Sequence, residues 1–122
     1  MLALTSPYVF IFENYRLDLD GGGLFRDSED GRVPVALGSR ALDILGLLVA
    51  RRGELVTKAQ IFAAVWPHIV IEESNLFVQI AALRRVLDEG RAAGSCIQTV
   101  SGQGYRFVVP VGRRDRSALS GI

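Results

Sequence analysis

The residues best suited to recognition chemistry lie in one stretch, from Glu72 to Leu87. Four of them recur at helical spacing and share one apolar stripe: Leu76, Ile80, Leu83 and Leu87. The opposite face carries small or uncharged side chains and one arginine: Ser74, Val78, Ala81, Ala82 and Arg85. A solvated helix normally exposes Lys and Glu, so this face is typical of a helix that presses against a partner. A core helix buried on both sides would show the same pattern, and the stretch alone favours neither interpretation.

No comparable group of residues is suited to catalysis or metal binding. His68 falls in an expected loop and has no Cys or His at ligand spacing, so we do not expect a metal site. Cys96 has no base beside it and fits a small apolar strand residue. Gly102-Gln103-Gly104 is too short for a nucleotide fingerprint and does not open a helix. Without a paired acid and base, we expect neither an enzyme nor a cofactor.

Length and composition are typical of a soluble globular domain. The chain has 122 residues, of which 49% are hydrophobic and 22% charged, with a formal net charge of +1. Positive charge for a polyanionic partner must therefore gather locally. It does so late in the chain, where seven arginines face three acidic residues: Arg84, Arg85, Arg91, Arg106, Arg113, Arg114 and Arg116 against Asp88, Glu89 and Asp115. A single cysteine, short apolar runs and the lack of a signal-peptide pattern predict a cytoplasmic location.

The first third of the chain is expected to form a small antiparallel sheet of about four strands. After a flexible leader at residues 1–7, residues 8–19 form two strands that break at Glu13-Asn14. Residues 24–26 and 32–37 form two more, separated by turns, and the last has Val33, Val35 and Leu37 on one face. Because Pro34 has no amide donor, we place that strand at a sheet edge.

Three helices are expected after Gly38. The first is broadly apolar from Ala41 to Val49, which predicts the central helix, and Ser39 is its expected N-cap. Thr57 and Gln60 form a capping box that opens the second helix. That helix should end before a proline and bury four residues: Ile61, Phe62, Val65 and Trp66. A loop of five or six residues leads to the third helix, and the pair has the size of a helix-turn-helix.

A β-hairpin follows the third helix. Residues 97–100 and 105–109 are rich in strand-forming residues, and the glycine-containing link from Ser101 to Gly104 joins them. Beyond Pro110 the chain turns polar and basic without periodicity. We expect residues 111–122 to be a linker or disordered tail.

Three of these segments resemble the OmpR/PhoB-type winged-helix DNA-binding domain. The stretch from Ile97 to Phe107 closely resembles the wing of that family, the stretch from Glu72 to Leu87 resembles its recognition helix, and Val65-Trp66 the end of its second helix. The resemblance covers about residues 8–110, with the motifs in the family's order. It implies an α+β fold, a winged helix-turn-helix with an N-terminal antiparallel β-sheet, three helices and a C-terminal β-hairpin wing.

The resemblance also implies a function, namely sequence-specific binding of double-stranded DNA by a bacterial transcriptional regulator. Helix 73–89 would enter the major groove, wing 97–109 would reach the minor groove, and the N-terminal sheet would pack against the helices. Because Met1 closely precedes the first strand, we expect no receiver domain before it, as in the CadC/ToxR-like arrangement. The other candidate partners are RNA polymerase, a further domain after Ile122, and a second copy of the chain in a weak homodimer on DNA.

Within the family's frame, twelve residues are candidates for DNA contact: Trp66, Ser74, Asn75, Val78, Gln79, Ala82, Arg84, Arg85, Thr99, Ser101, Tyr105 and Arg106. At least one of Arg84 and Arg85 is expected at a phosphate, and Val78 and Ala82 suit a thymine methyl group.

Other candidates keep two interpretations. Asn75 and Gln79 could read adenine through a bidentate amide, although both lie off the centre of the outer face. Trp66 fits the core better, but its indole N–H could reach a phosphate. Tyr105 could simply pack, whereas Arg106 could reach the DNA backbone.

The sequence departs from the family at three positions. Ala81 and Ala82 stand where members often carry arginines in the recognition helix, and Ser101 where the wing often has one. Fewer positive charges predict weaker binding that depends less on salt. They also leave an alternative, a winged helix used as a protein–protein interaction module. A basic stripe over the helix and wing would favour DNA, and a continuous apolar patch would favour a protein partner.

Overall fold

The computed structural model describes residues 8–20 and 22–115, which divide into two units. The first unit extends to Ala36 and resumes at Pro110, and the second unit is the continuous segment from Leu37 to Val109. The expected leader at residues 1–7 and the last seven residues of the expected tail lie outside the described residues.

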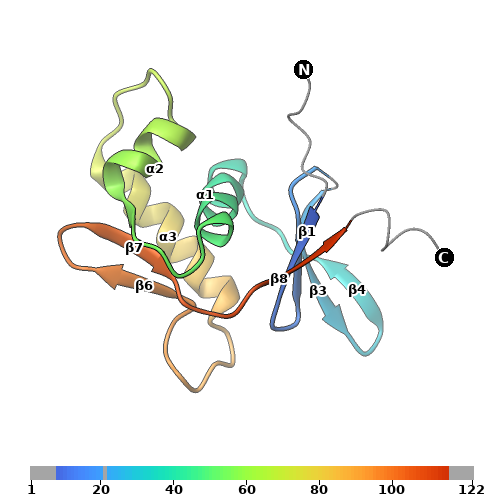
Figure 1. Ribbon diagram of the computed structural model, residues 1–122. Coiled ribbons are helices and arrows are strands. Elements are labelled where there is room, and N and C mark those ends of the chain that lie inside the picture. The colour runs from blue at the N-terminus through green and yellow to red at the C-terminus, as the bar shows by residue number, and fades with distance from the viewer. Residues whose placement is uncertain (1–7, 21, 116–122) are drawn as a thin grey trace. The chain divides into compact units, whose positions relative to one another are not determined.

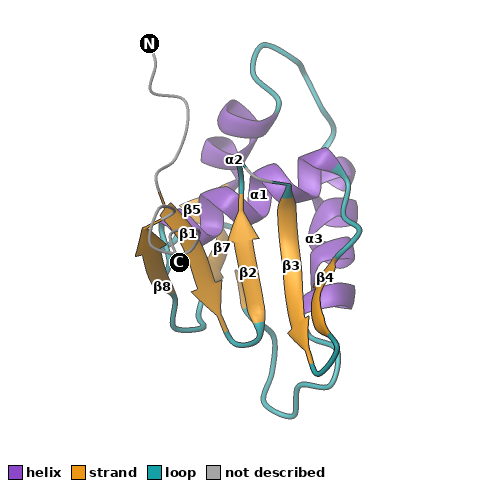
Figure 2. Cartoon of the chain, turned by 90° about the vertical axis from the view of Figure 1, so that its right-hand side faces the viewer, coloured by secondary structure: helices purple, strands orange, loops and turns teal. Residues whose placement is uncertain are grey.

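The first unit is an antiparallel sheet of five strands in the order β4-β3-β2-β1-β8 (Figure 2). The strands are β1 (Tyr8–Phe12), β2 (Tyr15–Asp18), β3 (Gly23–Ser28), β4 (Gly31–Pro34) and β8 (Gly112–Asp115). Phe12, Leu17 and Leu24 are buried on adjacent strands, as the alternating pattern predicts. β4 pairs only with β3, which confirms that Pro34 lies in an edge strand.

The fifth strand corrects the prediction of a linker or disordered tail from residue 111. Gly112–Asp115 form β8, which pairs antiparallel with β1 and sets Arg113 opposite Phe10. β8 has no apolar side chain, so no hydrophobic pattern predicts it; it pairs through its main chain, and the Arg113 guanidinium lies 4.5 Å from the ring centroid of Tyr8. The fourth strand was predicted too long. It ends at Pro34, and Val35 and Leu37 lie outside it.

The second unit combines three helices with a three-stranded sheet in the order β5-β7-β6 (Figure 1). Its elements are α1 (Ser39–Ala50), β5 (Val56–Thr57), α2 (Lys58–Val65), α3 (Glu73–Leu87), β6 (Ile97–Val100) and β7 (Gly104–Phe107). α1 contacts α2, α3 and β7, and its Ile44, Leu45 and Leu48 are fully buried. The predicted central helix is confirmed, and helices followed by a β6–β7 hairpin make the predicted α+β winged helix.

Local signals explain how the helices begin. The predicted capping box is present, since Gln60 N–H donates to Thr57 Oγ1 at 3.1 Å and Thr57 N–H donates to Gln60 Oε1 at 2.9 Å. The predicted cap at Ser39 is wrong. Gly38 is the N-cap of α1, without a side-chain hydrogen bond, and Ser39 is already the first helical residue.

None of the helices in the described part of the chain is long and apolar enough to span a membrane.

β5 is a two-residue strand that the sequence analysis missed. Its Val56 and Thr57 pair with Tyr105 and Gly104 of β7, which fixes the hairpin to the N-terminus of α2. Gly104 permits this close approach, because a Cβ at that position would lie 2.1 Å from the carbonyl oxygen of Val56. The hairpin is therefore the outer part of a small sheet rooted in the helical core.

Candidate nucleic-acid interface

The outer face of α3, defined as Ser74, Val78, Ala81, Ala82 and Arg85, is open to solvent. Val78 is 63% exposed, Ala82 is half-buried, and the other three are exposed. On the opposite side Leu76, Ile80, Leu83 and Leu87 are at most 2% exposed. The interpretation of a core helix buried on both sides is therefore wrong. α3 has one buried stripe and one free face, the geometry that a recognition helix needs.

One side of α3 is attached to the wing through Arg84. Its Nη2 donates to the Ile97 carbonyl oxygen at 2.6 Å and to Thr99 Oγ1 at 2.8 Å, and its Nε donates to Ser95 Oγ at 3.3 Å. The guanidinium carbon also lies 6.0 Å from the ring centroid of Tyr105. We call this side, which carries Phe77 and Arg84, the wing-facing flank. Figure 1 shows the β6–β7 hairpin running alongside α3.

Arg85 has the opposite environment. It is exposed on the outer face and forms no hydrogen bond or ion pair with the residues that the structure describes. The prediction that at least one of the two arginines contacts phosphate therefore fits Arg85 better than Arg84. Arg84 is already engaged by two hydrogen bonds to the wing and one to Ser95.

The remaining helical candidates lie away from the centre of the outer face. Asn75 is exposed and its amide donates weakly to the Glu72 carbonyl oxygen at 3.4 Å, while Gln79 is half-buried. Trp66 is only 6% exposed, and the guanidinium of Arg40 lies 6.0 Å from its ring. So little of Trp66 reaches solvent that the core interpretation fits it better than the phosphate contact.

The wing presents a short polar turn. Residues 101–103 are exposed, and Gly102 has a φ of +74°, which glycine adopts without strain. Gln103 N–H donates to the Val100 carbonyl oxygen at 2.9 Å and closes the turn. Ser101 therefore stands at the tip of the hairpin, free to face a partner.

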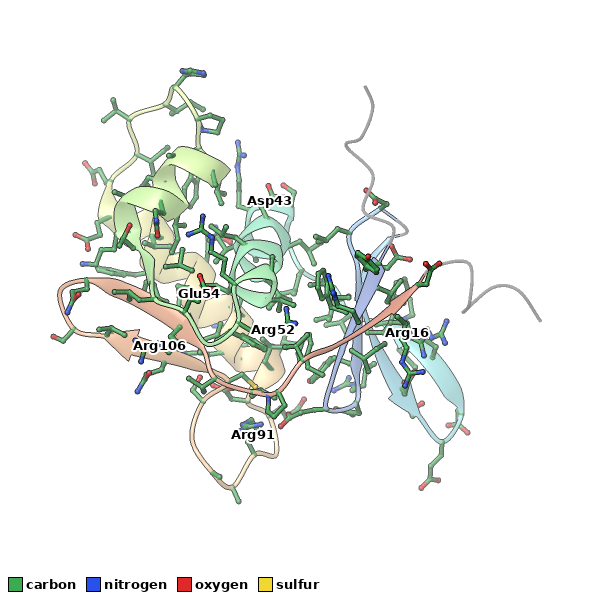
Figure 3. The ribbon with its side chains drawn as sticks, in the orientation of Figure 1. Arg16, Asp43, Arg52, Glu54, Arg91 and Arg106 are labelled. Atoms are coloured by element: carbon green, nitrogen blue, oxygen red, sulfur yellow. The ribbon has the colours of Figure 1, made fainter. Side chains whose placement is uncertain are left out.

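The two faces of the hairpin differ. Thr99 and Tyr105 are opposite one another, toward Arg84, and Tyr105 is only 4% exposed. Burial raises the pKa of the Tyr105 hydroxyl above its usual value, and the positive charges of Arg84 and Lys58 oppose that shift. Arg106, labelled in Figure 3, is on the other face of the hairpin. Its Nη1 donates to Gln98 Oε1 at 3.1 Å. Arg106 is half-buried, and its contact with the DNA backbone stays a prediction.

Phe77 is a surface residue that the sequence analysis left unassigned. It is 48% exposed, and Lys58 Nζ lies 5.7 Å from its ring centroid while forming an ion pair with Glu73. The available signal was its helical position, since residue 77 falls outside the buried stripe although it is large and aromatic. Phe77 and Val78 together give the first half of α3 an apolar surface.

Comparison with known proteins places this geometry in a family. Residues 31–107, more than half of the chain, match the family described as "Transcriptional regulatory protein, C terminal". The transcriptional regulator HilA of Salmonella typhimurium is 34% identical over 107 residues, which cover 88% of this chain and 18% of HilA. The chain thus spans about a fifth of the length of that relative.

Solved structures share the fold. The DNA-binding domain of E. coli CadC superposes with a TM-score of 0.73 at 22% identity, covering 90% of this chain and 99% of that one. The DNA-binding domain of Klebsiella pneumoniae RstA, solved in complex with the RstA box, gives a TM-score of 0.67 at 20% identity, covering 82% and 96%. With its matched residues, its three helices and its hairpin wing, the chain belongs to the OmpR/PhoB-type family of transcriptional regulatory C-terminal DNA-binding domains.

Proposed function

We propose that this chain binds double-stranded DNA sequence-specifically as part of a bacterial transcriptional regulator, with α3 in the major groove and the β6–β7 wing at the minor groove. The observation that carries the proposal is the open outer face of α3 beside a hairpin that Arg84 attaches to it. Membership of the family supports it, as does the structural neighbour solved with its DNA box. A cytoplasmic location follows from contact with the genome.

Contacts on α3 divide into two kinds. Val78, near the N-terminal end that goes deepest into a groove, reports base identity through a thymine methyl group. Arg85 lies seven residues further along the same face of α3 and neutralises a phosphate. On the wing, Ser101 and Arg106 approach the DNA backbone. The small side chains of Ser74 and Ala81 let the helix lie close to the base edges.

Partners beyond DNA belong to the longer regulator. Ile69 and Val70, in the loop between α2 and α3, are 52% and 102% exposed, which gives the unit an apolar surface apart from the outer face of α3. We assign this loop to a protein contact, with RNA polymerase as the candidate. Further domains of the regulator and a weak dimer on adjacent half-sites complete the proposed assembly. Exposed apolar residues also favour the alternative of a protein-interaction module.

The test separates the two kinds of contact. A duplex is first selected from random sequences, and Kd is then measured on it and on a scrambled duplex at several salt concentrations. Val78→Ala should relax preference at one thymine-containing step and leave the salt dependence alone. Arg85→Ala should weaken binding to both duplexes alike and reduce the slope of log K against log salt by about one.

Two outcomes would contradict the proposal. A salt slope unchanged by Arg85→Ala would show that α3 is oriented differently. Failure of the parent protein to prefer any duplex over the scrambled one would favour the interaction module instead.

A further inference from the structure

Phe77 is the largest apolar side chain that α3 leaves in solvent. Phe77 and Val78 are the exposed large hydrophobic residues of the helices in the described part of the chain, at 48% and 63%. They are adjacent in sequence and therefore about 100° apart around the helix, with Val78 on the outer face and Phe77 on the wing-facing flank. Exposure of both residues indicates an apolar contact surface of this helix.

The ring of Phe77 is held from one side by Lys58. The ammonium group of Lys58 lies 5.7 Å from the ring centroid, a cation–π distance, and also pairs with Glu73 one turn earlier on α3. The backbone N–H of Lys58 donates to the Gln103 carbonyl oxygen of the wing turn at 3.1 Å. Lys58 therefore links the Phe77 ring and Glu73 of α3 to the wing turn, and the ring itself remains half exposed.

The chemistry of the major groove limits what such a ring can recognise. Base edges there present hydrogen-bond donors and acceptors, and the one apolar group is the C5 methyl of thymine. A phenyl ring placed against polar base edges would remove them from water without replacing their hydrogen bonds, which is unfavourable. A thymine methyl group instead gains apolar contact.

Building on the proposed function, we propose that Phe77 contacts the C5 methyl of a thymine, next to the step that Val78 reads. Two adjacent apolar side chains would then require two thymine methyl groups in the operator, on one strand or across the two strands. The Lys58–Glu73 pair positions the ring for this contact, and the preference does not depend on charge. Loss of the contact should therefore change base preference without changing the salt slope.

The experiment removes one methyl group at a time. Each thymine of the selected duplex is replaced by deoxyuridine, and Kd is measured by fluorescence anisotropy for the parent, Phe77→Ala, Val78→Ala and Val108→Ala. The parent should lose about fourfold in affinity at the thymine under Phe77, the equivalent of one buried methyl group. Phe77→Ala should lose less than about 1.5-fold there and keep the loss at the thymine under Val78. Val108 is also exposed, at 46%, and Val108→Ala should behave as the parent does.

Phe77→Leu keeps an apolar side chain and should keep the sensitivity to that methyl group. Its thermal midpoint and that of Phe77→Ala verify folding. The inference fails if the parent is insensitive to every thymine beyond the one under Val78. It also fails if Phe77→Ala keeps all the parent's losses. A parent that selects no duplex at all would instead refute the proposed function, so the two failures are distinguishable.

Discussion

The wing-facing flank and the outer face of α3 carry neighbouring arginines with opposite environments. Arg84 directs its guanidinium at the Ile97 carbonyl oxygen, Thr99 and Ser95, within 3.3 Å of each. Arg85, one residue later, is exposed and has no partner among the described residues. Residue type alone does not distinguish them. One helix thus holds its wing with one arginine and leaves the next for a partner, and position around the helix decides which.

The largest effect on stability is expected at the root of the wing. Gly104→Ala would place a Cβ 2.1 Å from the Val56 carbonyl oxygen and 2.8 Å from the Thr57 Cα, both backbone atoms that cannot easily move. We expect the free energy of unfolding to fall by about 3 kcal/mol. Trp66 is the only tryptophan and lies in the second unit, so its fluorescence during urea unfolding reports this change.

Gly102→Ala is the matched control for this substitution. Gly102 has a φ of +74° but open space around it, so alanine should cost only about 1 kcal/mol of backbone strain. Equal losses in the two variants would show that β5 and β7 do not approach as closely as the structure indicates.

A smaller effect is expected from Arg84→Ala. The substitution removes three hydrogen bonds, one of them to a backbone carbonyl oxygen, and should lower the free energy of unfolding by about 2 kcal/mol. Arg85→Ala should stay within about 0.5 kcal/mol, because it changes only an exposed side chain. The same urea titration checks both variants. Similar losses from both arginine substitutions would show that Arg84 does not hold the wing to α3.

The smallest effect on stability should come from a charge added to the outer face. Ala81 is exposed, and arginine is a good helix former, so Ala81→Arg should change the free energy of unfolding by less than about 0.5 kcal/mol. If this face meets DNA, the slope of log K against log salt should steepen by about one. Ala50→Arg adds the same charge at the exposed end of a different helix, α1. An identical salt slope in both variants would argue against the outer face as the contact.

Much of the second unit could be predicted from local patterns. The stripe of Leu76, Ile80, Leu83 and Leu87 is buried as predicted. Residues at this spacing lie on one face of a helix, and that face packs against the core. Thr57 and Gln60 form their capping box because both partners lie within one turn. The resemblance of the wing added the arrangement of helices and hairpin. These signals are short-range or carried by a family motif.

Long-range contacts could not be read from the sequence in the same way. Arg84 meets the carbonyl oxygen of a residue thirteen positions later, and a backbone acceptor leaves no mark on residue type. β8 offers only glycine, arginines and an aspartate, yet pairs with β1 through its main chain. Residue preference predicts Ser39 as the N-cap of α1, whereas the N-cap is Gly38, one residue earlier. The first two contacts join residues far apart in the sequence, whereas the one-residue shift of the α1 N-cap is a local difference.

The pairing of β8 with β1 affects the order in which the chain can fold. Tyr8 is opposite Asp115, so one edge of the first sheet closes only after almost the whole described chain has been synthesised. The second unit is a continuous segment and can form its core while the ribosome is still adding residues. Until β8 arrives, β1 is an unpaired edge strand with apolar Val9, Phe10 and Ile11, which invites pairing between chains. A chain cut at Pro110 should keep a folded second unit but aggregate through β1, whereas one that extends past Asp115 should remain monomeric.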